Sequence, residues 1–284
     1  MLDAAKASDF EVSPHAMQRV RAEARIGFKA AGGRTRLADL YQSGSAKIRL
    51  PKVYDTPVTA VLINTAGGLT GGDRVSFTVN AAAGTHAIVT SQTAERAYRS
   101  NAGSARVTGR FCLEAGADVE WLPQETILFD ASRLKRQLHA DLTGDARLLM
   151  LESVVVGRAA MGERVGSVLF TDSWRLRRDG RLVFADDIRL KGDPALCLRG
   201  RATAKGGVAV ATLVDCALDA EDRLDRARNL LADRTGAGVQ AAASAWNGLL
   251  IARFVSEDGR GLRSALTTFL TGYRGMELPR VWHC

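Results

Sequence analysis

The sequence predicts a mainly β protein whose strands stack as layers of a β-helix-like solenoid or of a sandwich, with two or so α-helices in the C-terminal half. Apolar and polar residues alternate from about residue 25 to about residue 215, and turn signals interrupt the alternation every ten to fifteen residues. Within this region, three segments repeat the same pattern of a strand, a turn glycine and a second strand. A helical period of apolar residues begins only after it.

Length and composition favour a single domain. A chain of 284 residues can bury a sizeable core as one large domain, and no Pro/Ser-rich linker or block of charge divides it. We therefore expect one domain at residues 25–284, preceded by a mobile tail at residues 1–24.

The charge of the chain does not predict a nucleic-acid partner. The formal net charge is +8 and the isoelectric point is about 9.7, but the basic residues are scattered singly among Asp and Glu. Dispersed arginine is typical of a solvated surface or of protein contacts. No apolar run approaches the length that spans a membrane, so we expect no membrane partner either.

Cysteine usage indicates a reducing compartment. The four cysteines lie far apart in the sequence, and the chain shows no signal-peptide pattern. We therefore expect a cytoplasmic protein without disulfides. The cysteines are Cys112, Cys197, Cys216 and Cys284.

A glycine-rich loop is the first unusual element. Residues 64–73 read Asn-Thr-Ala-Gly-Gly-Leu-Thr-Gly-Gly-Asp and lie between strand-like residues 60–63 and 75–79. A Walker loop ends in Gly-Lys-Ser/Thr and a dinucleotide fingerprint opens a helix, whereas Asp73 and Arg74 lead into a strand. Because glycine adopts positive φ without a clash, we expect a structural loop that is bent or closely approached at two glycine pairs. These are Gly67, Gly68, Gly71 and Gly72.

The repeated frame comes next along the chain. It is centred on turn glycines Gly84, Gly116 and Gly144, which is the spacing that stacked strand layers would give. A polar residue follows each glycine by eight positions, so these polar residues would line one row if the layers stack. Strands of similar length in a sandwich would give similar frames without such a row. The polar residues are Gln92, Gln124 and Glu152.

A hairpin is predicted where residues 174–178 and 181–184 flank Asp179-Gly180, since Asp-Gly supplies the positive φ of a two-residue turn. Its inward residues should be Leu176, Leu182 and Phe184.

Helical periodicity appears late in the chain. One helix, capped near Asp219, should carry apolar residues from Leu224 to Leu231 and end by Gly236. A second should run from about Leu262 to Gly272. We expect their apolar faces to pack on the β core.

The sequence shows no catalytic or zinc-binding constellation. It lacks a Gly-x-Ser-x-Gly elbow, a cysteine-nucleophile signature and paired Cys/His at short spacing. Histidines His86 and His139 alternate with apolar strand residues, which favours packed or surface positions. The adjacent pair His283 and Cys284 is interpreted as a frayed chain end, without an assigned role.

Several carboxylates interrupt strands that would otherwise bury well. A buried carboxylate must be paired, hydrogen-bonded or solvated through a cavity. Several acids at a similar depth in the fold suggest a polar channel or an interface. Taken singly, each acid is explained equally well by a salt bridge to an arginine such as Arg133 or Arg158. The acids are Glu125, Asp130, Glu152, Asp186 and Asp187.

Six motifs in order, from about residue 25 to the C-terminus, resemble the urease accessory protein UreD (UreH) family. They are residues 64–73, Thr90-Ser91-Gln92-Thr93 with Tyr98-Arg99, residues 121–125, Leu151-Glu152 through Gly157-Arg158, residues 161–163 and residues 278–282.

The resemblance implies a scaffold that is not an enzyme. Members bind urease apoprotein, recruit UreF and through it the GTPase UreG, and serve nickel insertion into the urease active site. It also implies a largely β fold with added helices and a polar passage for nickel. A relay that releases its ion suits sparse carboxylates and hydroxyls, so we expect transient nickel and no tightly bound cofactor.

By motif position, three acids and three neighbouring polar residues are assigned to this passage. Arg74 departs from a second acid found there in some relatives, and its cation would weaken direct binding of nickel by Asp73. The passage residues are Asp73, Ser91, Gln92, Thr93, Glu152 and Asp186.

A second class of function stays open: a β-solenoid enzyme acting on a carbohydrate or other small molecule, with Glu125, Asp130 or Glu152 as an acid/base pair. Sugar sites usually stack on Trp or Tyr, and the chain has only four of each.

Overall fold

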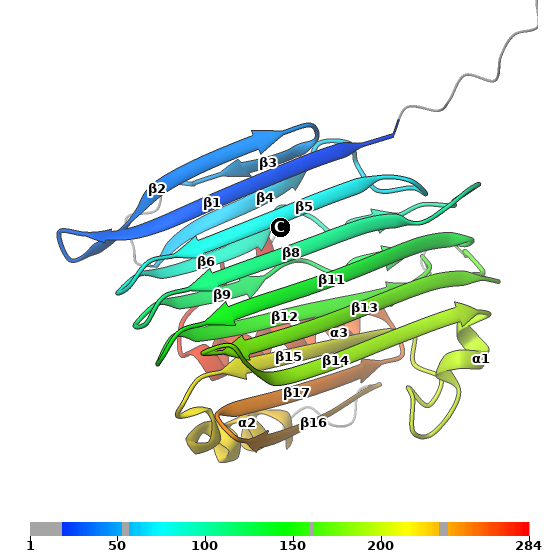
Figure 1. Ribbon diagram of the computed structural model, residues 1–284. Coiled ribbons are helices and arrows are strands. Elements are labelled where there is room, and N and C mark those ends of the chain that lie inside the picture. Colours follow the sequence, from blue (N-terminus) through cyan, green and yellow to red (C-terminus); the bar gives the residue numbers. More distant parts are fainter. Residues whose placement is uncertain (1–18, 53–56, 159–161, 233–237, 284) are drawn as a thin grey trace, which may run out of the picture.

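Two β-sheets lie face to face in the computed structural model, which describes residues 19–52, 57–158, 162–232 and 238–283 (Figure 1). Sheet A, the front layer of Figure 1, follows the order β14-β13-β11-β8-β5-β1-β2. Its strands are β1 Arg21–Ala31, β2 Arg34–Ser43, β5 Arg74–Ala81, β8 Ala105–Leu113, β11 Ser132–Leu142, β13 Val168–Arg178 and β14 Arg181–Gly192.

Sheet B forms the second layer in the order β16-β17-β15-β12-β9-β6-β4-β3. Two short strands lie beside this path: β10 pairs with β12, and β7 pairs with β10. Its strands are β3 Ala46–Arg49, β4 Val58–Asn64, β6 His86–Ser91, β9 Asp118–Leu122, β12 Arg147–Val156, β15 Ala209–Cys216, β16 Val239–Trp246 and β17 Leu249–Ser256, with β7 Glu95–Ala97 and β10 Thr126–Leu128 at the side.

The middle of the molecule is a stack of three coils, as the repeated frame predicted. β5, β8 and β11 pair in parallel in sheet A, and each turns at a glycine into β6, β9 or β12 of sheet B. The turn glycines Gly84, Gly116 and Gly144 all have positive φ. Neighbouring turns are hydrogen-bonded, since the Gly116 amide donates to the Asp145 carboxylate. The β-solenoid-like stacking is therefore confirmed.

The strand register that the predicted row of polar residues assumed changes by one residue at the start of the third coil. His86 pairs with Asp118, which keeps the frame, but Asp118 pairs with Arg147, one residue later than the frame requires. Farther along the coils the register changes again, because Thr126 pairs with Val154, and Gln92, Gln124 and Glu152 all line one cavity, which is described below. Because side chains alternate between the faces of a strand, Glu152 lies on the same side of β12 as the buried Met150 and Val154, toward the space between the sheets.

The predicted hairpin is β13 and β14, with positive φ at both Asp179 and Gly180. Leu176 and Phe184 are buried, but Leu182 is 48% exposed. A bulge shifts the register after Leu176, and the extra residue moves Leu182 to the outside.

Helices cover the outer face of sheet B behind the plane of Figure 1. The helix predicted near Asp219 is the short η2 Ala220–Arg223 followed by α2 Leu224–Ala232, and its predicted end at Gly236 lies outside the described residues. The second, α3 Gly259–Arg274, passes Gly272 and ends at Gly275 in the left-handed conformation. α1 Pro194–Leu198 and η3 Arg280–His283 were not predicted.

Both ends of the described chain are packed more firmly than predicted. β1 begins at Arg21, so residues 21–24 belong to sheet A and not to a tail, while residues 1–18 lie outside the described part. At the other end Trp282 is buried and its indole N–H donates to the Leu122 carbonyl. The frayed-end interpretation is therefore wrong for His283, and Cys284 is not described.

Candidate functional site

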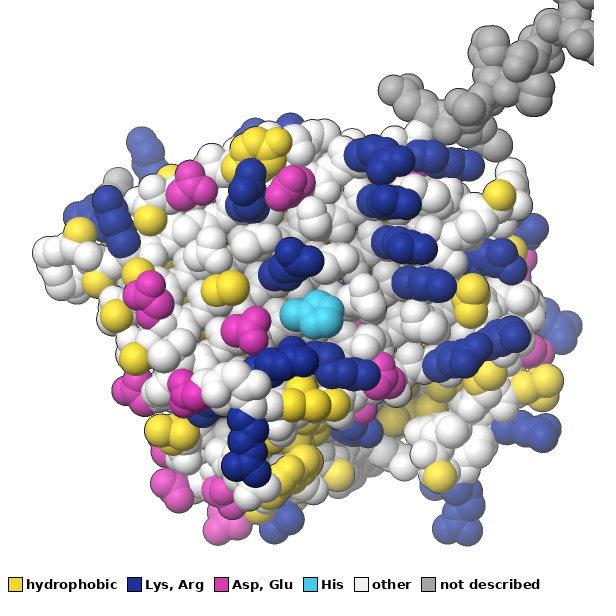
Figure 2. Space-filling model, viewed as in Figure 1, with side chains coloured by type: hydrophobic (Ala, Val, Ile, Leu, Met, Phe, Trp, Pro, Cys, Tyr) yellow, Lys and Arg dark blue, Asp and Glu magenta, His cyan; other side chains and the backbone are white. Residues whose placement is uncertain are grey.

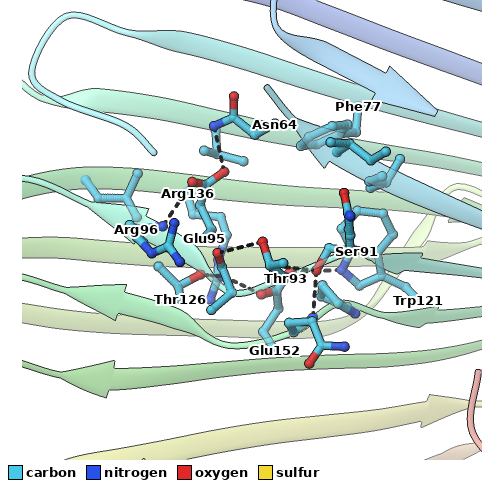
Figure 3. Close-up of a pocket in the computed structure, with 18 of the residues that line it drawn as sticks. Asn64, Phe77, Ser91, Thr93, Glu95, Arg96, Trp121, Thr126, Arg136 and Glu152 are labelled. Atoms are coloured by element: carbon cyan, nitrogen blue, oxygen red, sulfur yellow. Dashed lines mark hydrogen bonds and ion pairs between the residues drawn. The ribbon is translucent and has the colours of Figure 1, made fainter. Parts of the chain in front are cut away.

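A cavity of about 140 Å³, enough for several water molecules, lies between the two sheets (Figure 3). The cavity lies where the sheet B strands of two coils are interrupted for a few residues. β6 ends at Ser91 and β7 starts at Glu95, while β9 ends at Leu122 and β10 starts at Thr126. The third coil has no such break, so β12 runs past the gap and presents Glu152 to the cavity.

The two irregular segments, residues 92–94 and 123–125, are stacked by hydrogen bonds. The Gln124 amide donates to Ser91 Oγ at 2.9 Å, and the Glu95 amide donates to the Glu125 carbonyl at 2.9 Å. Gln92 and Thr93 are exposed at the mouth. The mouth is therefore polar, and one backbone and one side-chain hydrogen bond hold the wall behind it in place.

The inner end of the cavity holds a buried cation shared by two carboxylates. Arg136 on β11 donates to both oxygens of Asp172 on β13, at 2.9 and 2.6 Å. The same guanidinium forms a short ion pair with Glu152 across the space between the sheets. Trp121 Nε1 donates to the other Glu152 oxygen at 2.9 Å, and Thr126 accepts from Arg136 at 3.2 Å. All these polar groups have partners.

Polar groups continue beyond this cluster toward the edge strands. In the strand register of sheet B, Glu152 lies opposite Thr212 on β15, and Thr212 lies opposite Arg253 on β17. Arg253 reaches across to sheet A and forms an ion pair with Asp186 on β14 at 2.9 Å. We call Arg136, Glu152, Asp172, Thr212, Asp186 and Arg253 the interior polar layer, of which Arg253, with a 58% exposed side chain, is the solvent-facing end.

The glycine loop borders the mouth of the cavity and is itself held by Asp73. Asn64 Nδ2 donates to Glu95 at 3.0 Å, which ties the loop to β7. The buried Asp73 carboxylate accepts the backbone N–H groups of Val20 and Thr70, each at 2.8 Å. Asp73 therefore closes the loop, and it does not line the cavity.

Burial changes the proton affinity of two acids at the site. It raises the pKa of Glu152 to about 7, although Arg136 acts against the shift, while the charge of Asp172 adds to it. Burial also raises the pKa of Glu95 despite the hydrogen bond from Asn64. Glu152 is thus a weaker acid than an exposed glutamate, because burial disfavours its charged form.

Comparison with known proteins identifies the family. The model of the UreD urease accessory protein family matches residues 20–283. This chain belongs to the UreD family. The urease accessory protein UreD of Rhizobium etli is 46% identical over 267 residues, which cover 94% of this chain and 96% of that protein. The UreD of Methylobacterium sp. (strain 4-46) is 45% identical over 275 residues, covering 95% and 98%. That of Azorhizobium caulinodans is 43% identical over 265 residues, covering 93% and 97%.

The site of this UreD-family chain contains part of the predicted residue set. Ser91, Gln92, Thr93 and Glu152 line the cavity, and Asp186 lies at the far end of the interior polar layer. Arg74, whose charge was expected to weaken Asp73, is exposed, and no ion pair links the two among the described residues.

Sequence reasoning missed several residues that complete the site. Arg136, for example, shares the inward face of β11 with the buried Leu134 and Leu138, and this inward position was the available signal. The missed residues are Asn64, Glu95, Trp121, Thr126, Arg136, Asp172, Thr212 and Arg253.

The three acids of the enzyme alternative have separate partners in the UreD fold. Glu125 pairs with Arg263 of α3, and Asp130 pairs with Arg99 and accepts two backbone N–H groups. Only Glu152 of the three lines the cavity. Among the described residues no group of three or more His, Cys, Asp or Glu could hold a metal ion, and no helix is long and apolar enough to cross a membrane.

Glu152 should make the stability of this UreD-family protein depend on pH. Its pKa is about 7 in the folded state against an ordinary 4.5, so between these values the folded state binds more protons than the unfolded state. The free energy of unfolding should therefore fall as pH rises through this range. Glu152→Gln should lack that decrease. Urea denaturation of both proteins at several pH values would measure it, and a difference between them that does not change with pH would contradict the assignment.

Proposed function

We propose that this UreD-family chain is a non-catalytic scaffold that binds urease apoprotein, recruits UreF and the GTPase UreG, and gives nickel a polar passage to urease. Family membership supports the accessory role. The observation that supports the passage is the interior polar layer. Its Arg136 and Glu152 line the open cavity beside Ser91 and Thr93, and the layer continues along paired strands to the Asp186–Arg253 pair.

The charge of the layer suits a divalent cation that must not be retained. At the cluster one guanidinium is shared by Glu152 and Asp172, so the three groups sum to one negative charge when both acids are ionised. Carboxylate oxygens bind nickel, but here Arg136 already occupies them. Nickel would therefore compete with the arginine at each carboxylate and would be bound weakly.

A proton would compete at the same place. A carboxyl with a pKa near 7 is only partly ionised at neutral pH, and a metal ion can bind only after the proton leaves. Glu152 would thus bind nickel less tightly than an exposed carboxylate does. Hydroxyl and amide groups at the mouth, from Ser91, Gln92 and Thr93, would replace part of the hydration shell as the ion enters.

The double variant Glu152→Gln/Asp186→Asn tests the passage, because both changes keep the shape of the side chain and remove its charge. Reconstitution should use urease apoprotein, UreF, UreG, GTP and limiting nickel. Complex formation by gel filtration and nickel per urease active site are measured on the same preparations. We expect an intact complex and a several-fold lower nickel content.

The control is Asp187→Asn, which removes the neighbouring carboxylate of β14, a residue that is exposed and bonded to Arg175. It should load nickel normally. Normal loading by the double variant would exclude these acids from the passage. Failure of the wild-type chain to bind urease, UreF or UreG would instead contradict the scaffold itself.

A further inference from the structure

A row of basic side chains crosses the outer face of sheet A, away from the interior polar layer. Arg21 of β1 pairs in register with Arg74 of β5, Arg74 with Arg106 of β8, and Arg106 with Lys135 of β11. We call these four residues the basic row. Figure 2 shows basic side chains in a column near one end of this face.

Among the described residues, no acid forms an ion pair with the basic row. All four residues are exposed, and none of their side chains forms an ion pair or hydrogen bond with another described residue. Adjacent strands lie about 4.8 Å apart, and like charges directly opposite one another destabilise a sheet. Four such cations in succession are therefore a cost to the fold that a bound acidic partner would remove.

The surroundings of the row suit a protein partner. Three of its members, Arg21, Arg74 and Arg106, line a shallow hollow of about 420 Å³ together with the hydroxyls of Ser76 and Thr108. Glu23 also lines the hollow, and its carboxylate is already paired with Arg25. The hollow thus offers three unpaired cations, two hydroxyl groups and one acid that already has a cation as its partner.

We propose that the basic row is a docking surface for an acidic α-helix of a partner protein. The axis of this helix would run along the row, across the strands. On a helix, acidic residues at i, i+4, i+7 and i+11 form one stripe with about 5–6 Å between neighbours, close to the strand spacing. The stripe spans about 16 Å and the row about 14 Å.

Other acidic partners fit the row less well. Side chains on one face of an extended strand repeat every 6.6–6.8 Å or so, which loses register with the cations within two steps. Duplex DNA binding usually covers a larger footprint than this row, which spans about 14 Å. The inference does not depend on the proposed function, because the row and the interior polar layer lie on opposite faces of sheet A.

The test uses two synthetic helical peptides of equal composition on the full-length chain. Both are 20-residue alanine-based peptides whose helicity is checked by circular dichroism. One carries four Glu as a stripe at i, i+4, i+7 and i+11, and the other has the same four Glu distributed around the helix. Binding is measured by fluorescence anisotropy at low and high salt.

The stripe peptide should bind more tightly than the distributed peptide, and added salt should weaken it. Arg74→Glu/Arg106→Glu should weaken binding of the stripe peptide by about tenfold or more, because two attractions become repulsions. The control Arg34→Glu/Arg36→Glu reverses two exposed charges on β2, opposite the far end of β1, and should bind normally. Thermal melting confirms that each variant is folded.

Equal binding of the two peptides, or unchanged binding by Arg74→Glu/Arg106→Glu, would overturn the proposal. Tighter binding of a DNA duplex or of inorganic polyphosphate than of the stripe peptide would overturn it too, because the row would then be a phosphate surface.

Discussion

Replacing Arg136 with methionine should lower the free energy of unfolding by about 3–5 kcal/mol, since removal of one partner leaves buried charges unpaired. Arg136 is 4% exposed, and Glu152 and Asp172 are buried to a similar degree. Without the guanidinium, two carboxylates would face each other with no cation between them. Urea denaturation with circular dichroism would measure the loss.

Arg133→Met is the matched control, because Arg133 lies on the same strand, β11, with its side chain exposed. It should change stability by less than about 0.5 kcal/mol. The combined variant Arg136→Met/Glu152→Met/Asp172→Leu should recover most of the stability, since a buried charged cluster can be replaced by apolar side chains of similar volume. Equal stability of Arg136→Met and wild type would contradict the burial of Arg136, Glu152 and Asp172 away from water.

Gly68→Val should lower the free energy of unfolding by about 2–5 kcal/mol, the sum of backbone strain and overpacking. Gly68 has φ +155°, and an added Cβ would lie 2.8 Å from the Arg96 carbonyl oxygen and in contact with the Tyr98 ring. The carbonyl belongs to β7 and accepts the Leu69 amide, so it cannot move freely.

Two other glycines of the loop separate the cost of backbone strain from the cost of overpacking. Gly67 has φ +74° with nothing within 4 Å of an added Cβ, and at Gly72, with φ +94°, the neighbour is the flexible Arg19 side chain. Gly67→Val and Gly72→Val should therefore cost only the strain, about 1–3 kcal/mol. Thermal melting should rank Gly68→Val lowest of the three. Equal melting temperatures for all three variants would show that close approach at Gly68 is unimportant.

The periodic features of this fold were predictable from local sequence. Glycines at Gly84, Gly116 and Gly144 and the Asp179-Gly180 turn identified the coils and the hairpin, because positive φ is a local requirement. The one-residue shift before Arg147 and the bulge beside Leu182 were not predictable, because register is set by pairing with strands far away in sequence.

The candidate site was predictable only in part for the same reason. Glu152 stood out as an acid after an apolar strand, but its partners Arg136 and Asp172 lie 16 and 20 residues away on another sheet. Asp73 was chosen by motif, and the structure gives it two backbone partners within the glycine loop. A motif identifies which residues matter without saying whether they hold the loop or line the cavity.

The most direct test of the passage is nickel loading by Arg136→Met/Glu152→Met/Asp172→Leu, which keeps a packed interior and removes the charged cluster. Nickel per urease active site is measured after reconstitution with UreF, UreG and GTP, on complexes whose composition is verified by gel filtration. The account predicts an intact complex that delivers little nickel. An intact complex with normal nickel content would contradict it.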